Sequence, residues 1–491
     1  MKRAIPPLLL MAGLLTAVVV TFVLVHNPAM SYYNSGNAKQ ARGDLDGAIA
    51  EYTQSIEARH DFVNAYDNRG YAEQAKHDLD AAIADYTKAI ELQPDDAFAY
   101  INRGLAKKDK ADLTGAIADQ TRVIELRPGS ANAYDNRGLT RKAAVDWKGA
   151  AADYTKAIEL QPNDAKAYSD RGQLEAEQGE SENAISDLTK AISLKPDDAM
   201  AYIRRGSAKA GKEDLYGAIA DYTKGLELKP VIPDAYYDRA IVLTTKGDRN
   251  AALADYNKAI ELKPDFAEAY NNRGLLKQSM GDLDGAIADF TKAIESDPRL
   301  WYAYKDRSRA KRAKGDIDGA ISDASRSIEI DPNQPAYHNR GCLRYDTQQY
   351  QPALADFRKE IDVDPSSTYA HFRVCLIRTR LGEGPSARAE LNAYLSGPNM
   401  PKSDPWALQI GRFLTGQLPE PGFLAEAKNS GEKLDAAHSC EAYFYAGSMR
   451  LFNGDKATAV DYFRKAVATN AKTFTEYASA VAELRSLEAQ Q

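Results

Sequence analysis

The sequence predicts an all-α protein, a right-handed α-solenoid of stacked antiparallel helix pairs that follows an N-terminal transmembrane helix. Two observations lead to this prediction. A tyrosine recurs at a fixed interval through most of the chain, and a long apolar stretch follows the first basic residues. A fixed interval of roughly 20 to 50 residues is typical of a repeat array, in which each repeat stacks on its neighbours.

Residues 1–28 form the predicted membrane anchor. Lys2 and Arg3 precede an apolar stretch from Leu8 to Val25, which would span about 27 Å as a helix, close to the ~30 Å hydrocarbon core of a bilayer. A cleaved signal peptide and a buried soluble helix are the alternatives. Either membrane interpretation keeps the basic residues in the cytoplasm and exports the rest of the chain.

The repeats begin after the anchor. Their interval is 34 residues, and 33 at the last step, as shown by Tyr66, Tyr100, Tyr134, Tyr168, Tyr202, Tyr236, Tyr270, Tyr304 and Tyr337. With these tyrosines as position 4, Gly or Ala usually fills position 8, Ala position 20, Tyr or Phe position 24, Ala position 27 and Pro position 32. Eleven contiguous repeats then occupy residues 29–395.

The spacing within a repeat predicts two antiparallel helices. In residues 63–96, Ala82, Tyr86 and Ala89 lie on one face of the second helix. Pro at position 32 ends this helix because its ring prevents continuation. We expect the small residues at positions 8 and 20 to let the two backbones approach closely, and the aromatic residue at position 24 to fill the wider gap. One repeat cannot bury its own apolar face, so neighbours must stack.

The pattern lapses after Leu395. Residues 396–434 are rich in proline and glycine and predict a connector with short helices. A final repeat and a C-terminal capping helix are predicted in residues 435–491, where Tyr443, Gly447 and Phe463 return to register.

The interval and the Tyr, Gly, Ala, Tyr, Ala, Pro pattern resemble the tetratricopeptide repeat family. The resemblance covers about three quarters of the chain and implies a superhelix that binds peptides or proteins on its concave surface, lined by the first helix of each repeat. The C-terminal part weakly resembles bacterial periplasmic tetratricopeptide lipoproteins that act as adaptors for a protease and for cell-wall hydrolases. This second resemblance implies a protein of the bacterial envelope.

Arginine at position 7 and aspartate at position 23 recur together, always sixteen residues apart. This spacing predicts an ion pair between the two helices of each repeat, so that the array carries a structural ladder. A groove that binds anions is the alternative, which the recurring acidic partner disfavours. The predicted pairs are Arg69 with Asp85, Arg103 with Asp119, Arg137 with Asp153, Arg171 with Asp187, Arg205 with Asp221, Arg239 with Asp255, Arg273 with Asp289, Arg307 with Asp323, and Arg340 with Asp356.

The stretch WYAYKDRSRAKRAKG, at residues 301–315, is unusually basic. Some members of the family grip the C-terminal carboxylate of a peptide with Lys, Asn and Arg side chains from three successive repeats. By this resemblance a peptide-binding site is predicted, and a solvated basic face is the alternative. The predicted residues are Lys305, Arg309, Arg312, Asn339, Tyr369 and Arg373, of which Arg309 and Tyr369 depart from the family pattern.

Composition and motifs exclude several classes of function. The net charge of -7 argues against a general nucleic-acid-binding protein. The three cysteines do not suggest a disulfide framework, and the six histidines lack the spacing of metal ligands. Neither a phosphate-binding loop nor a nucleophile motif occurs. We therefore expect no catalytic residues, no metal and no cofactor.

The sequence thus predicts a non-catalytic scaffold or adaptor that binds proteins or peptides at the bacterial envelope. A partner with an acidic or C-terminal carboxylate motif is expected, and self-association is possible. The repeats would face the periplasm or the exterior from a single-pass anchor, or be secreted to the periplasm after signal cleavage. The alternatives are an accessory subunit or regulator of an envelope protease or cell-wall hydrolase, and a self-associating structural organiser.

Overall fold

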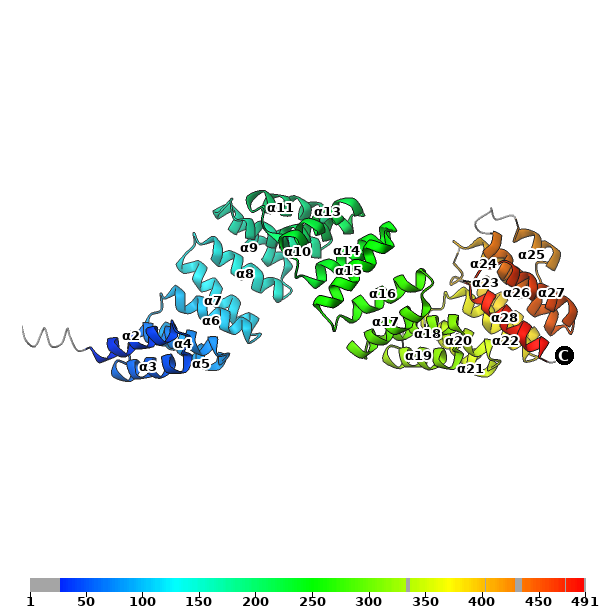
Figure 1. Ribbon diagram of the computed structural model, residues 1–491, viewed down its shortest axis with the longest axis horizontal. Coiled ribbons are helices and arrows are strands. Elements are labelled where there is room, and N and C mark those ends of the chain that lie inside the picture. Colours follow the sequence, from blue (N-terminus) through cyan, green and yellow to red (C-terminus); the bar gives the residue numbers. More distant parts are fainter. Residues whose placement is uncertain (1–26, 333–335, 402, 429–434, 473, 490–491) are drawn as a thin grey trace, which may run out of the picture. The chain divides into compact units, whose positions relative to one another are not determined.

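The computed structural model describes residues 27–332, 336–401, 403–428, 435–472 and 474–489, and all regular elements among them are α-helices (Figure 1). The predicted all-α fold of stacked helix pairs is therefore confirmed. The apolar stretch of the predicted anchor lies outside the described residues. Within the described ranges, none of the helices has both the length and the apolar character needed to cross a bilayer.

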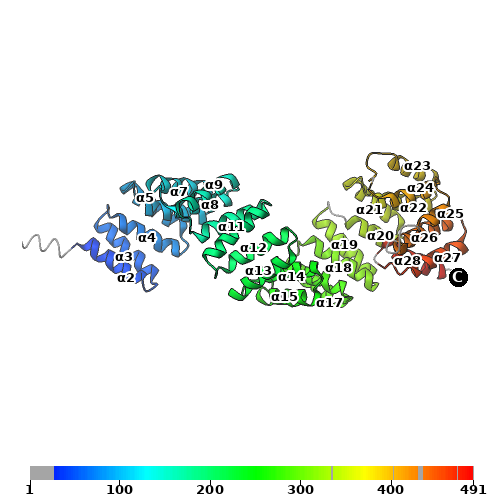
Figure 2. The ribbon, with the colours of Figure 1, turned by 90° about the horizontal axis from the view of Figure 1, so that it is seen from above.

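The chain divides into two compact units, an N-terminal unit of residues 1–242 and a C-terminal unit of residues 243–491. The helices of the N-terminal unit follow one another as antiparallel pairs, repeats 1 to 6, each with a helix A and a helix B (Figure 2). In order, the pairs are α2 (Pro28–Gln40) and α3 (Leu45–Ala58), α4 (Val63–Ala75) and α5 (Leu79–Leu92), α6 (Ala97–Asp109) and α7 (Leu113–Leu126), α8 (Ala131–Ala143) and α9 (Trp147–Leu160), α10 (Ala165–Glu177) and α11 (Ser181–Leu194), and α12 (Ala199–Gly211) and α13 (Leu215–Leu228).

Repeat 7 contains the boundary between the units, within α14 (Pro233–Lys246). The remaining helices belong to the C-terminal unit: α15 (Arg249–Leu262), α16 (Ala267–Ser279) and α17 (Leu283–Ser296), α18 (Trp301–Lys314) and α19 (Ile317–Ile330), α20 (Ala336–Asp346) and α21 (Tyr350–Val363), α22 (Thr368–Arg380) and α23 (Gly384–Leu395), α24 (Pro405–Thr415), α25 (Glu420–Glu426), α26 (Asp435–Phe452) and α27 (Lys456–Ala468), and α28 (Thr475–Glu488). Pairs α16–α17 to α22–α23 are repeats 8 to 11, and α26–α27 is repeat 12.

Helices A line the inner side of the stack in the N-terminal unit. Each helix B contacts its own helix A and the helix A of the next repeat. Successive helices A also contact each other, as α8 does with α10 and α10 with α12, and among the described helices of this unit no two successive helices B make comparable contacts. The stack therefore curves toward its helices A, which form what we call the inner face.

The ring at position 24 packs directly on the small residue at position 8. A Cβ added to Gly138 would lie 2.7 Å from Cε1 of Tyr154, closer than the two atoms could approach. In repeat 9 the larger of the two side chains stands at position 8, where Ser308 replaces glycine, and the smaller at position 24, where Ala324 replaces the aromatic residue. The expected close approach of the backbones is therefore only part of the reason for glycine here, and space for the facing ring is the larger part.

A left-handed residue at position 15 joins helix A to helix B in every repeat of the N-terminal unit, usually before an aspartate that caps helix B. Asp146 shows the cap: its Oδ1 accepts a hydrogen bond from the Gly149 amide at 2.9 Å. Glycine suits the left-handed conformation, but repeat 4 uses Val145, with φ of 62°. A β-branched side chain is strained in this region of backbone space.

Replacing Val145 by glycine is expected to stabilise the protein by about 1 kcal/mol, because the relieved left-handed strain exceeds the entropy that glycine loses on folding. Val145 is 65% exposed, so little apolar burial is lost. Urea unfolding followed by circular dichroism would measure the gain. The matched change Gly179→Val, at the same position of repeat 5, should lower stability; stabilisation by both changes would contradict the strain argument.

Candidate functional site

The arginines and aspartates of the predicted ladder lie within hydrogen-bond distance in eight repeats. In repeat 4, Arg137 Nε and Nη2 donate to Asp153 Oδ2 and Oδ1 at 2.9 and 2.7 Å. The ninth predicted pair, Arg239 and Asp255, is divided between the two units. The pairs that lie within a single unit are Arg69–Asp85, Arg103–Asp119, Arg137–Asp153, Arg171–Asp187, Arg205–Asp221, Arg273–Asp289, Arg307–Asp323 and Arg340–Asp356.

Each ladder arginine also bonds to the preceding repeat, which sequence reasoning missed. Arg137 Nη1 donates to Thr121 Oγ1 at 3.1 Å, on helix B of repeat 3. The same contact recurs with a Thr, Asn or Ser at position 25 in each case. The recurrence of Thr, Asn or Ser at position 25 is visible in the sequence and could have predicted this contact. The ladder therefore connects repeats as well as the two helices of one repeat.

Position 11 supplies a second cation to the ladder aspartate in most repeats. Lys107 Nζ lies 2.8 Å from Asp119 Oδ2, and Arg141 Nη1 lies 2.8 Å from Asp153 Oδ2. Repeats 2 and 5 have Glu73 and Glu175 at this position instead. Burial, and then the charge of the nearby ladder aspartate, raises the pKa of each of these two carboxyls to about 7. In repeats 2 and 5 the ladder aspartate therefore lies near a second carboxyl group, which is unfavourable when both are charged.

Replacing Glu73 by glutamine is expected to stabilise the protein by about 1 to 2 kcal/mol at pH 8 and not at pH 4. Folded Glu73 holds its proton up to about pH 7, whereas the ordinary pKa is 4.5, so stability falls as the pH rises between these values. Thermal unfolding across pH 4 to 8 would measure the effect. Lys107→Gln, at the same position of repeat 3, removes an attraction and should lower stability at pH 8; a gain from both changes would contradict this account.

Four of the predicted peptide-binding residues belong to repeats 9 and 10. Lys305 Nζ lies 5.2 Å from the ring centroid of Trp301 and 3.6 Å from Asp306 Oδ1. Arg312 Nη2 pairs with Asp346 Oδ2 at 2.5 Å. The Asn339 amide donates to Ser308 Oγ at 2.9 Å, and Arg309 is exposed. Contacts within the chain therefore already engage three of these four residues.

The other two predicted residues are covered by the C-terminal helices, contrary to expectation. Arg373 has no exposed surface, and its Nη2 donates to Glu476 Oε1 of α28 at 2.9 Å. Its guanidinium also lies 4.8 Å from the ring centroid of Phe444 in α26. Tyr369 is partly buried, and burial followed by the charge of Glu441 raises the pKa of its hydroxyl. The Arg373 side chain is therefore not available to a peptide, whereas Tyr369 keeps part of its surface exposed.

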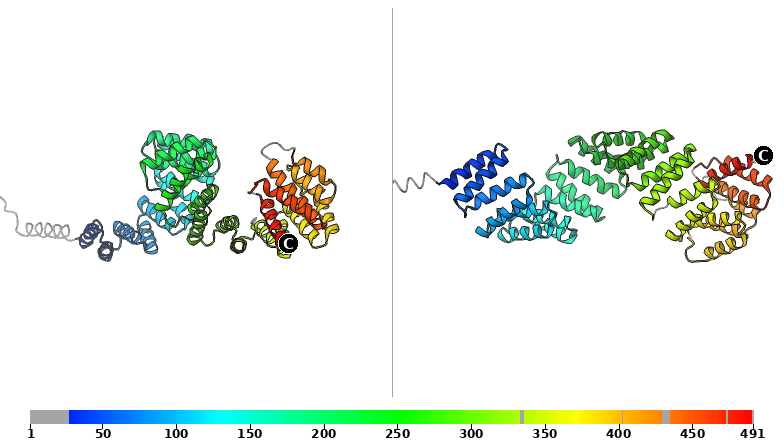
Figure 3. Two further views of the ribbon diagram at one scale, coloured as in Figure 1. Left: turned by 45° about the vertical axis from the view of Figure 1, so that its right-hand side comes forward. Right: turned by 90° about the horizontal axis from the view of Figure 1, so that it is seen from below.

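Helix α28 closes the inner side of repeats 10 and 11. It contacts α20, α26 and α27 (Figure 3). Glu483 accepts hydrogen bonds from Tyr345, at 3.1 Å, and from Arg380, while Ser479 donates to Asp346 at 2.6 Å. A predicted capping helix therefore fills the positions at which the sequence had suggested a carboxylate-binding groove.

Cys342 and His338 form the arrangement that most resembles catalytic chemistry. Cys342 Sγ lies 3.5 Å from His338 Nε2, and His338 Nδ1 lies 3.1 Å from both carboxylate oxygens of Glu360. Burial alone would raise the pKa of the thiol, but the charges of His338 and Arg373 lower it. Because Cys342 has no exposed surface, a substrate cannot reach the sulfur. The described cysteines are all free thiols.

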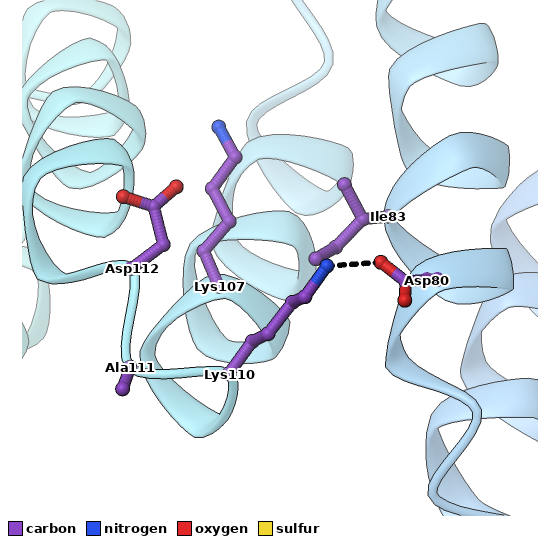
Figure 4. A pocket seen from close by; sticks show the side chains of 6 residues that line it. All are labelled: Asp80, Ile83, Lys107, Lys110, Ala111 and Asp112. Atoms are coloured by element: carbon purple, nitrogen blue, oxygen red, sulfur yellow. Dashed lines mark hydrogen bonds and ion pairs between the residues drawn. The ribbon is translucent and has the colours of Figure 1, made fainter.

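The described residues offer little else for chemistry. No group of three or more of their His, Cys, Asp or Glu side chains could hold a metal ion. A surface crevice of about 410 Å³ lies between repeats 2 and 3, lined by Asp80, Ile83, Lys107, Lys110, Ala111 and Asp112 (Figure 4). The ion pair of Lys110 with Asp80 recurs as Lys76 with Asp46 and Lys314 with Asp284, so the crevice follows from the stacking of repeats.

The inner face of the N-terminal unit, in contrast, exposes large apolar side chains. They stand at positions 2 and 9 of helices A, where Met30, Tyr71, Phe98 and Met200 are 41%, 53%, 63% and 39% exposed. The aromatic residues at position 24 of this unit, such as Tyr86 and Tyr154, are fully buried. Exposed large apolar groups at recurring positions are typical of a surface that binds another molecule.

Comparisons with known proteins point to one family. A family model described as TPR repeat matches residues 72–110 and 242–281, and two described as tetratricopeptide repeat match residues 136–199 and 267–300. No curated protein matches the sequence significantly. Among solved structures, MamA is 30% identical, with 33% of this chain and 94% of MamA covered and a TM-score of 0.32. YrrB, described as a TPR protein with an unusual peptide-binding site, is 28% identical, with 38% and 97% covered and a TM-score of 0.34.

Proposed function

The chain belongs to the tetratricopeptide repeat family, and from that membership we propose that it is a non-catalytic scaffold that binds a protein or peptide along the inner face of its helices A. The observation that carries this proposal is the exposure of Met30, Tyr71, Phe98 and Met200 on that face. Partly exposed apolar anchors surrounded by polar groups are the usual composition of a protein interface. The peptide-binding site named in the description of YrrB supports the same class of function.

A photo-crosslinking amino acid at position 98 tests this proposal in the native cell. Phe98 is 63% exposed on the inner face, and Val145 is 65% exposed in a turn outside it, so position 145 provides a control of matched exposure. Discrete crosslinked partners are expected from position 98 and not from position 145. Equal crosslinking from both positions, or crosslinks from neither, would remove the inner face as the binding surface.

We also propose that residues 1–28 place the array at the bacterial envelope, on the periplasmic or exterior side. Support comes from the sequence alone: two basic residues precede an apolar stretch of membrane-spanning length. An impermeant thiol reagent applied to intact spheroplasts should label a cysteine introduced at the exposed Tyr71. Protection of that cysteine until the membrane is lysed would place the repeats in the cytoplasm instead.

A further inference from the structure

Repeats 2 and 4 carry the same acidic residue at position 5 of helix A, but only one of them has a cation beside it. In repeat 4 this residue is Asp135, which is 3% exposed. Its Oδ2 accepts a hydrogen bond from Lys166 Nζ, and that nitrogen also lies 3.0 Å from Asp170 Oδ2. Lys166 stands at position 2 of the next helix A. The array can therefore hold a lysine ammonium at this point of its inner face.

Asp67 is the equivalent residue of repeat 2, and Phe98 takes the position of Lys166. Asp67 forms no ion pair within the described part of the chain, and its Oδ1 has neither a hydrogen-bond partner nor contact with solvent. The titratable groups that face it are Asp96 and Asp85, which are acidic, and the hydroxyl group of Tyr86. Burial, and then the charge of Asp96, raises the pKa of Asp67 to about 7. The equivalent of the Lys166 ammonium is thus missing here.

Two exposed aromatic side chains accompany this carboxyl group. Tyr71 is one helical turn after Asp67 on the same face of α4 and is 53% exposed, and Phe98 is 63% exposed. The guanidinium of Arg127 stacks on Phe98, 4.6 Å from its ring centroid, so this ring already accepts a cation on one side. An aromatic ring beside a carboxylate suits the apolar stem and the charged end of a long basic side chain.

We propose that Asp67, Tyr71, Asp96 and Phe98 form a site that binds one lysine or arginine side chain of the partner, which we call the acidic-aromatic site. The proposal rests on the proposed function, since it names the chemistry of the partner that the inner face binds. The partner's cation takes the place that Lys166 Nζ occupies at Asp135, and its alkyl stem lies against the two exposed rings. The binding of this cation ionises Asp67, so binding strengthens as the pH rises toward about 7 and levels off above that pH.

A substitution within the chain tests the cation position without any ligand. Phe98→Lys supplies a side chain of the same type and position as Lys166 and should raise the midpoint of thermal unfolding at pH 8. The rise should disappear when Asp67→Asn is added, and Phe98→Leu should not produce it. An equal rise in the midpoint with and without Asp67→Asn would show that Asp67 does not receive the cation. The absence of a rise in the Phe98→Lys variant would show the same.

Phage display of random dodecapeptides on the full-length protein tests recognition. Selected peptides should be enriched in Lys or Arg beside apolar residues, and a selected peptide should bind about tenfold more weakly after Asp67→Asn or after replacement of its basic residue by glutamine. The control Asp135→Asn, where Lys166 already occupies the equivalent position, should change affinity less than twofold. Selected peptides that bind through Phe98 without a basic preference would overturn the acidic-aromatic site and keep the proposed function; no enrichment at all would count against both.

Discussion

Replacing Arg373 by alanine is expected to lower the free energy of unfolding of the C-terminal unit by about 3 to 5 kcal/mol, because it leaves a buried carboxylate without its partner. Arg373 has no exposed surface and Glu476 is 2% exposed. The pKa of Glu476, which burial would raise, is lowered chiefly by Arg373, so the carboxylate remains charged at neutral pH. The substitution also removes the guanidinium that lies 4.8 Å from the Phe444 ring centroid. Urea unfolding at pH 7 would measure the loss.

An exposed ion pair of the same unit provides the control. Arg358 lies 3.9 Å from Glu390, and its side chain is 52% exposed, so Arg358→Ala should cost less than about 1 kcal/mol. Arg373→Met combined with Glu476→Gln should recover part of the loss, because it removes both buried charges. Equal effects of Arg373→Ala and Arg358→Ala would mean that the charges of the Arg373–Glu476 pair are not held away from water.

The repeats were predictable because their determinants recur along the chain. Tyr154 at position 24, the ladder pair of Arg137 with Asp153 and the proline after helix B each appear at intervals that the sequence displays directly. The fully buried ring of Tyr154 needs the space left by Gly138, so the local pattern and the packing agree. A residue that recurs at the same position of every repeat reveals its structural role from the sequence alone, without knowledge of the side chains that it contacts.

Arg373 shows what such a pattern leaves out. Its position within the repeat matches that of a peptide-binding residue in related proteins, and nothing local distinguishes it. Its partner Glu476 is 103 residues away, on a helix that belongs to none of the repeats. The fold-back of α28 thus turned a predicted binding residue into a core residue. Asp67 was missed for a related reason, since its missing cation becomes visible only when position 5 of one helix A is compared with position 2 of the next.

The closure of repeats 10 and 11 also separates two roles within the family's fold. Their inner side is occupied by Glu476, Ser479 and Glu483 of the same chain, whereas the inner side of repeats 1 to 6 exposes apolar side chains and holds the Asp67 carboxyl group, whose Oδ1 has no hydrogen-bond partner. A surface that satisfies its own polar groups offers a partner little free energy of binding. We therefore expect substitutions at Phe98 to alter partner binding and substitutions at Arg373 to alter stability.

Replacing Asp153 by alanine is expected to cost about 3 to 5 kcal/mol, because two cations lose one shared partner. Asp153 is 3% exposed and accepts hydrogen bonds from Arg137, at 2.9 and 2.7 Å, and from Arg141, at 2.8 Å. Both guanidiniums are also largely shielded, with side chains 13% and 24% exposed. Urea unfolding of the full-length protein at pH 7.5, followed by circular dichroism, would measure the loss.

Asp187 is the matched control, because it occupies the same ladder position in repeat 5 but has a different second neighbour. Arg171 binds it at 2.6 and 3.0 Å, whereas Glu175 replaces the second cation. Removal of Asp187 therefore loses one attraction and relieves one repulsion, so Asp187→Ala should cost clearly less than Asp153→Ala. The pKa of Glu175, now about 7 through burial and the charge of Asp187, should fall in that variant. Equal losses from the two aspartates would mean that the second cation at position 11 contributes nothing to the ladder.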